Sequence, residues 1–152
     1  MVERSGAETL ARLKQLEKEL RISPEALFEH PEIASAVFEA VSDAIVIADE
    51  KGVIRLVNHE AEIMFGYARD ELIGHNVTVV IPKEYREAHA RKQKEYFKCP
   101  DTRRIEGLYG QRRTGEKFSV IIALHPLRSV AGNLVMATLR EVRRVPTPNG
   151  TQ

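Results

Sequence analysis

The sequence has little of several features that would place it in a special class of protein. It contains a single cysteine, Cys99, which excludes an internal disulfide and favours a reducing compartment. No apolar run is long enough to span a bilayer, and the first five residues do not resemble a signal peptide. The formal net charge is only +1, so nucleic acid is not indicated as a partner. Together these absences predict a cytoplasmic protein without a membrane segment.

Motifs for catalysis are absent from the sequence as well. There is no nucleophile elbow, no kinase signature and no paired metal-binding carboxylate motif. Four histidines lack the spacing of a zinc site, both with one another and with the cysteine: His30, His59, His75 and His125. A length of 152 residues suits one domain with one core and a short extension. We therefore predict that this chain is not an enzyme by itself.

An amphipathic helix is predicted near the N-terminus. Ser5 and Glu8 have the spacing of a capping box. Leucines at spacings of three, three and four then form one stripe on a helix that runs to about residue 21: Leu10, Leu13, Leu16 and Leu20. So short a helix needs a partner surface. That surface is either its own domain or the same helix of a second subunit, and the sequence leaves both open.

The rest of the chain has a pattern of two strands, several helices and three strands. Two more helical segments precede the first strand, beginning at Ser23 and around Pro31. Strands are predicted at residues 44–48, 53–57, 103–112, 117–127 and 133–142, and a long helix at about 83–97. This order predicts an α+β fold, with a five-stranded antiparallel sheet and helices gathered on one face.

The stretch from Val57 to Asn76 lies at the centre of this pattern. Asn58 is a favourable N-cap for a short helix, and Gly66 suits the left-handed residue that closes it. A second short helix should run to Gly74. This helical run, with the sequences Phe-Gly-Tyr at 65–67 and Glu-Leu-Ile-Gly at 71–74, resembles the PAS family of sensory domains, specifically the branch found in bacterial sensor kinases.

The resemblance covers residues 34–143 and implies the PAS fold for them. Residues 1–33 are then N-terminal amphipathic helices that cap the domain or join two subunits. Residues 144–152 are a flexible tail, because Pro146 and Pro148 prevent a helix from continuing directly. The resemblance also implies a role in two-component signal transduction, with a signalling output domain or a partner kinase.

Related PAS proteins commonly form homodimers through the outer face of the sheet and an N-terminal helix. In this sequence both faces of the last two predicted strands are partly apolar, which indicates a sheet covered on both sides. We therefore expect a homodimer. Its predicted interface combines the leucine stripe with three strand residues: Ile121, Val135 and Leu139.

The long helix carries a second resemblance. Haem-binding oxygen-sensor PAS domains have a Pro-x-x-x-Arg-x-x-His run there, and the histidine ligates the iron. Residues 82–89 read Pro-Lys-Glu-Tyr-Arg-Glu-Ala-His, which matches in residue type and spacing. The resemblance implies haem b with His89 as the iron ligand. Helical spacing predicts Tyr85 and Tyr96 on the same face as His89, and Ile122 and Leu124 match the family's distal apolar residues.

The sequence also bears on ligands other than haem. Flavin-photoadduct PAS domains need a reactive cysteine where this sequence has Val77, so that chemistry is not expected. The distal arginine of the oxygen sensors has no fixed counterpart: ungapped counting places Glu106 there, whereas Arg103 or Arg104 requires a gap elsewhere. Two alternatives stay open. One is an interaction module without a ligand, in which His89 only packs or hydrogen-bonds; the other is a small organic ligand held by Tyr85, Tyr96 and His89.

Overall fold

The computed structural model describes residues 5–20, 29–130 and 132–143. The chain divides into two compact units, residues 1–37 and 38–152. The first contains α1 (Ser5–Leu20) and most of α3 (Pro31–Ala40). The predicted helix that begins at Ser23 and the predicted tail of residues 144–152 lie outside the described residues.

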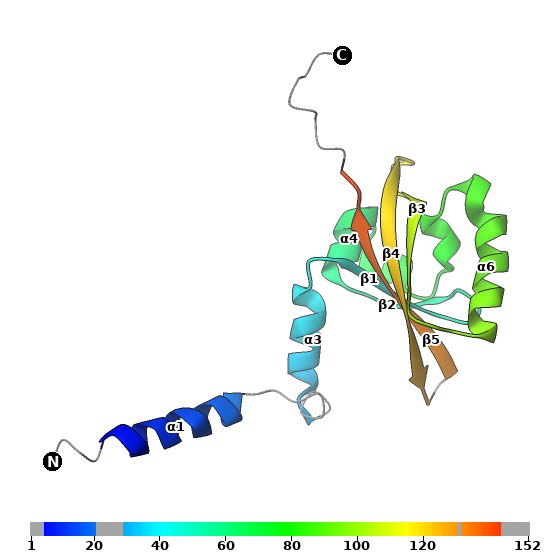
Figure 1. Cartoon of the computed structure of the whole chain (residues 1–152). Helices are drawn as coiled ribbons and strands as arrows, with labels where there is room; N and C mark the ends of the chain where they lie inside the picture. Colours follow the sequence, from blue (N-terminus) through cyan, green and yellow to red (C-terminus); the bar gives the residue numbers. More distant parts are fainter. Residues whose placement is uncertain (1–4, 21–28, 131, 144–152) are drawn as a thin grey trace. The chain divides into compact units, whose positions relative to one another are not determined.

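The second unit is built on one antiparallel sheet of five strands (Figure 1). The strands are β1 (Ala44–Asp49), β2 (Ile54–Val57), β3 (Arg103–Gln111), β4 (Lys117–Ser129) and β5 (Gly132–Glu141). Their order across the sheet is β2-β1-β5-β4-β3. The helical segments between β2 and β3 are α4 (His59–Phe65), α5 (Arg69–Leu72), η1 (Val77–Val80), η2 (Lys83–Tyr85) and α6 (Arg86–Lys98). The predicted fold class is confirmed.

The core lies between the helices and one face of the sheet. Phe65 of α4 and Leu72 of α5 are each 1% exposed and pack in one cluster with Val120 of β4 and Leu139 of β5. We call the sheet face that carries Val120 and Leu139 the inner face. Successive residues of a strand point to opposite sides, so the outer face of β4 carries Ile121 and the alternate residues that follow it.

The strand register corrects two residues of the predicted dimer interface. Directly opposite residues of an antiparallel pair share a face. Leu139 lies opposite Ile122 and is only 7% exposed, so it belongs to the core. Val135 lies opposite Pro126, on the same inner face. Neither shares a face with Ile121, and the prediction for these two residues is wrong; the outer face of β5 carries Leu134, Met136 and Thr138 instead.

One buried side chain, that of Asn58, joins the start of this unit to the sheet and to α4. Its Oδ1 accepts hydrogen bonds from the backbone N–H groups of Ala61 at 3.1 Å and Ile45 at 2.9 Å. Its Nδ2 donates to the carbonyl oxygens of Asp43 at 3.0 Å and Phe38 at 3.2 Å. The predicted cap is confirmed, and its other three hydrogen bonds hold together segments far apart in the sequence.

Candidate functional site

The face of α6 that points to the protein interior carries polar side chains. Four polar side chains at spacings of three and four residues are buried or half-buried: Arg86, His89, Gln93 and Tyr96. The positions between them on the opposite side, such as Arg91, Lys94 and Lys98, are exposed. This spacing puts the four on one helix face. Only two of these residues, His89 and Tyr96, were predicted from the sequence to belong to the site.

Three of the four side chains donate hydrogen bonds to backbone carbonyls of neighbouring segments. The bonds are Arg86 Nε to Ile81 O at 3.0 Å, Gln93 Nε2 to Glu50 O at 3.0 Å, and Tyr96 Oη to Asp101 O at 2.8 Å. They tie α6 to the segment before it, to the β1–β2 turn and to the loop before β3. His89 differs from them, because it has no hydrogen-bond or ion-pair partner among the residues that the structure describes.

The surroundings of His89 keep its imidazole neutral. Burial lowers the pKa of His89 below its usual 6.5, and the positive charge of Lys92 lowers it further. Both effects disfavour the imidazolium form. At neutral pH this ring therefore carries a nitrogen lone pair that no protein donor within the described ranges occupies. That is the chemical state of a histidine that binds a metal.

Tyr85 precedes the first residue of α6 and is its N-cap residue. It belongs to the 3₁₀ turn η2, is 44% exposed, and stacks on Tyr109 of β3 with ring centres 5.8 Å apart and an angle of 11°. The spacing rule that predicted its position holds within an α-helix, whereas Tyr85 lies just before α6 and its ring packs on a strand. Of the predicted trio of Tyr85, His89 and Tyr96, α6 itself carries His89 and Tyr96 on one face.

The sheet residues predicted for the site lie on the inner face. Ile122 and Leu124 are half-buried, and Ile122 packs against the core cluster. Arg103 lies opposite Leu124 and therefore shares that face. Its Nε donates to Asp101 at 2.6 Å, and its guanidinium lies 5.2 Å from the centre of the Tyr96 ring.

The two other candidates for the distal polar residue lie elsewhere. Arg104 is opposite Ala123, which places it on the outer face. It forms an ion pair with Glu106 at 3.3 Å, and both side chains are about two-thirds exposed. Of the three candidates, the register therefore places Arg103 alone beside Leu124 and Tyr96.

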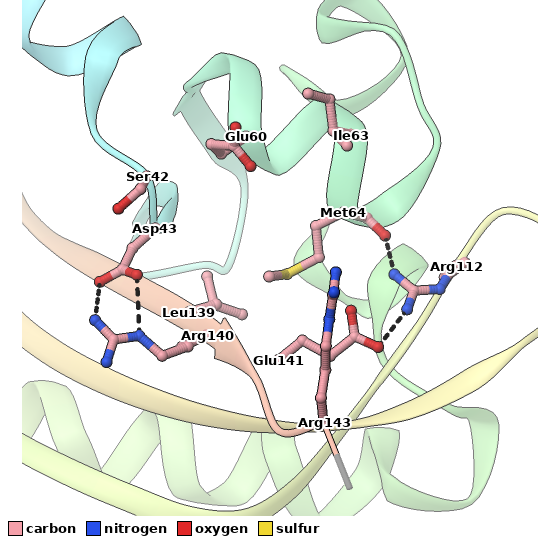
Figure 2. A pocket seen from close by; sticks show the side chains of 10 residues that line it. All are labelled: Ser42, Asp43, Glu60, Ile63, Met64, Arg112, Leu139, Arg140, Glu141 and Arg143. Carbon is pink, nitrogen blue, oxygen red and sulfur yellow. Dashed lines mark hydrogen bonds and ion pairs between the residues drawn. The ribbon is translucent and has the colours of Figure 1, made fainter. Parts of the chain in front are cut away.

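A groove of about 380 Å³ lies apart from these residues, between α4, the approach to β1 and the end of β5 (Figure 2). Its lining residues are Ser42, Asp43, Glu60, Ile63, Met64, Arg112, Leu139, Arg140, Glu141 and Arg143. Two ion pairs border it, Asp43 with Arg140 at 3.1 Å and Arg112 with Glu141 at 2.7 Å. Among the residues predicted for a site, only Leu139 lines the groove, and no motif in the sequence pointed to this groove.

Arg112 holds one wall of this groove together. Its guanidinium donates to the Met64 carbonyl at 2.6 Å, to Glu141 at 2.7 Å and to Glu116 at 3.0 Å. It also lies 4.0 Å above the centre of the Phe118 ring, a cation–π arrangement. The side chain is 21% exposed. One residue thus links the end of α4, the end of β5 and the β3–β4 turn.

Replacing Arg112 with alanine should lower the free energy of unfolding by roughly 1.5–3 kcal/mol, since hydrogen bonds to a charged, partly buried group are lost. The neighbouring Arg113 is a matched control. Its side chain is 56% exposed and pairs with Glu71 at 2.9 Å, so Arg113→Ala should cost about 1 kcal/mol or less. Urea denaturation followed by circular dichroism measures both values. Equal losses in the two variants would contradict the central role of Arg112.

Two further findings bear on the site. The described residues contain no group of three or more His, Cys, Asp and Glu side chains placed to hold a metal ion. Within the same part of the chain, no helix is long and apolar enough to cross a membrane.

Comparison with known proteins gives a consistent assignment. A family model described as the PAS fold matches residues 33–142. The chain is similar to the sensor protein FixL of Bradyrhizobium diazoefficiens, with 28% identity over 97 residues that cover 62% of this chain and 19% of FixL. It is also similar to the cell-division control histidine kinase PdhS of Brucella anthropi, with 40% identity over 50 residues that cover 33% of this chain and 5% of the kinase. The chain thus spans a fifth or less of the length of these relatives.

Solved structures show the same fold. The PAS domain of an HTR-like protein from Haloarcula marismortui superimposes with a TM-score of 0.66 and 25% identity, covering 85% of this chain and 99% of that domain. The family match covers the whole sheet and all the helices between β2 and β3. This chain belongs to the PAS family, and its PAS domain is of the sensory type found in signal-transduction proteins such as FixL and histidine kinases.

Proposed function

We propose that this PAS domain is a sensory input module that binds haem b through His89 and responds to a gas or to redox state. The observation that carries the proposal is the half-buried, neutral His89, the one polar side chain on the inward face of α6 without a protein partner among the described residues. Its task is ligand binding and signalling, without catalysis. A kinase would carry the output, either in the same longer chain or as a partner.

His89 and residues of the inner sheet face are the groups that would hold haem. A haem iron needs only one axial ligand from the protein, so a cluster of metal-binding side chains is not required. Bound haem would supply an iron coordination position for a diatomic gas. Ile122 and Leu124 would exclude water from that side, since they present apolar surface on the inner face. Arg103 is the polar candidate for contact with a bound gas, because it shares this face.

An interaction module without a ligand is the second candidate. The observation in its favour concerns the two tyrosines predicted for the site. The Tyr96 hydroxyl already donates a hydrogen bond to the Asp101 carbonyl, and the Tyr85 ring stacks on Tyr109. Both tyrosines are thereby less suited to hold a small organic ligand together with His89. In this case the signal would be a protein contact rather than a small molecule.

Absorption spectroscopy separates the two candidates. The purified chain is recorded before and after incubation with hemin and passage through a desalting column. The haem proposal predicts a retained Soret band that sharpens on reduction and shifts with carbon monoxide. A flat visible spectrum in both samples would contradict it and leave the interaction module.

We also propose that the chain forms a homodimer through the outer face of its sheet. Ile121 remains from the predicted strand residues, and Met136 and Leu134 take the places of Leu139 and Val135. In α1, Leu10 is 54% exposed and available for a helix seam. The side chains of Leu13, Leu16 and Leu20 lie outside the described residues. Sedimentation velocity at pH 8 tests this proposal, and a monomer at tens of micromolar would contradict it.

A further inference from the structure

The middle of the outer face is an apolar patch with one titratable side chain in it. The residues of this outer-face patch, all half-buried, are Ile47, Ile121, Ala123, His125, Leu127, Leu134 and Met136. His125 lies opposite Met136, with Ala123 and Leu127 as its neighbours on the same face of β4. Its neighbours along β4 and its direct partner on β5 are therefore apolar.

Charged side chains on this face lie around the patch and are already paired. Arg55 binds Asp49 at 2.7 Å, Arg104 lies 3.3 Å from Glu106, and Arg140 binds Asp43 at 3.1 Å. An apolar centre with a polar rim is the usual anatomy of a protein interface. Because each rim charge is neutralised within its own chain, two copies of this face would meet without like-charge repulsion. The occupant that this arrangement fits is a second copy of the chain.

No carboxylate faces His125. On β5 its outer-face neighbours are Met136, Leu134 and Thr138, and on β1 the nearest outer-face residue across from Met136 is Ile47. On β3 the nearest charged residue is Arg104, which lies opposite Ala123 and carries a positive charge. Within the described residues, His125 has no ion-pair or hydrogen-bond partner. Nothing nearby would therefore compensate a positive charge on this imidazole.

We propose that the outer-face dimer is sensitive to pH, and that protonation of His125 drives it apart. This inference rests on the proposed homodimer. Contact with a second copy would enclose His125 in an apolar interface, where an unpaired charge is costly. A histidine side chain changes charge between pH 5 and 8. The neutral ring is accommodated in the interface, whereas the imidazolium favours the separated chains, in which water can reach it.

Sedimentation equilibrium at pH 8.0 and pH 5.5 tests the inference on the purified chain. For the wild type, the dimer dissociation constant should rise by roughly 10- to 100-fold at the lower pH, since each dimer carries two such imidazoles. His125→Gln and His125→Phe cannot be protonated in this range and should keep the dimer at both pH values. His75→Gln, a change at an exposed loop position, is the matched control and should behave as the wild type does. Circular dichroism at pH 5.5 verifies that each chain is folded.

The outcomes separate this inference from the dimer proposal. An equal dimer dissociation constant of the wild type at both pH values would overturn the role of His125, while the dimer proposal itself would still hold. A pH dependence that persists in both His125 variants would also overturn it, since another group would then be responsible. A monomer at pH 8.0 would overturn the dimer and the inference together.

Discussion

Asn58→Ala is expected to lower the free energy of unfolding by about 3–5 kcal/mol, because one truncation leaves several buried backbone groups without partners. The side chain of Asn58 is 0% exposed and makes four hydrogen bonds. Without it, the N–H groups of Ile45 and Ala61 and the carbonyls of Phe38 and Asp43 each lose a hydrogen bond. Urea denaturation followed by circular dichroism measures the loss.

Asn76→Ala is the matched control for this prediction. Asn76 is also an N-cap, for η1, with its Oδ1 accepting from Thr78 N at 3.1 Å and its Nδ2 donating to Lys51 O at 3.0 Å. It is exposed, however, so water can replace the lost hydrogen bonds. Its substitution should cost about 0.5–2 kcal/mol, the range for an ordinary cap. If Asn58→Ala costs no more than Asn76→Ala, the buried junction does not stabilise the fold as argued.

His89→Ala should abolish the Soret band that hemin gives with the wild type, because the variant lacks the proposed axial ligand. We expect the apparent affinity for hemin to fall by at least about 100-fold, the upper end of the effect of losing a second-shell partner. Hemin titration with absorption detection measures this directly. Truncating a half-buried histidine without protein partners should leave the far-ultraviolet circular dichroism spectrum intact.

Tyr85→Ala provides the matched control for the haem site. The Tyr85 ring stacks on Tyr109 and is 44% exposed, so its removal should leave the hemin spectrum unchanged. Added imidazole should restore a Soret band in His89→Ala if the pocket itself is intact. An unchanged spectrum in His89→Ala would show that another residue ligates the iron or that hemin binds without His89.

Local patterns in the sequence predicted much of the fold and part of the site. The cap at Asn58 and the left-handed closing residue Gly66, with φ of 75°, are where residue preferences predict them. Within α6, helical spacing puts His89 and Tyr96 on one inward face, as the structure has them. Tyr85 precedes α6, and its ring stacks on Tyr109 of β3, a contact that helical spacing does not predict.

Contacts between distant segments decided which face of the sheet meets the helices and which residues Arg112 joins. The alternation along β5 shows which residues share a face, but only its register against β4, with Leu139 opposite Ile122, shows which face meets the helices. The same holds for Arg112, whose partners Met64 and Glu141 lie 48 and 29 residues away.

By itself, then, the sequence determined the order of strands and helices and the inward position of His89. Periods of 2 and 3.6 residues and capping preferences act over a few neighbouring positions, so they can be read without the structure. Short motifs in the same stretches indicated the family. Only the tertiary structure decided which side of the sheet is the core, where the groove lies, and that Asn58 and Arg112 join distant segments. These features depend on strand register and on side chains that meet across the fold, and such contacts leave no local period in the sequence.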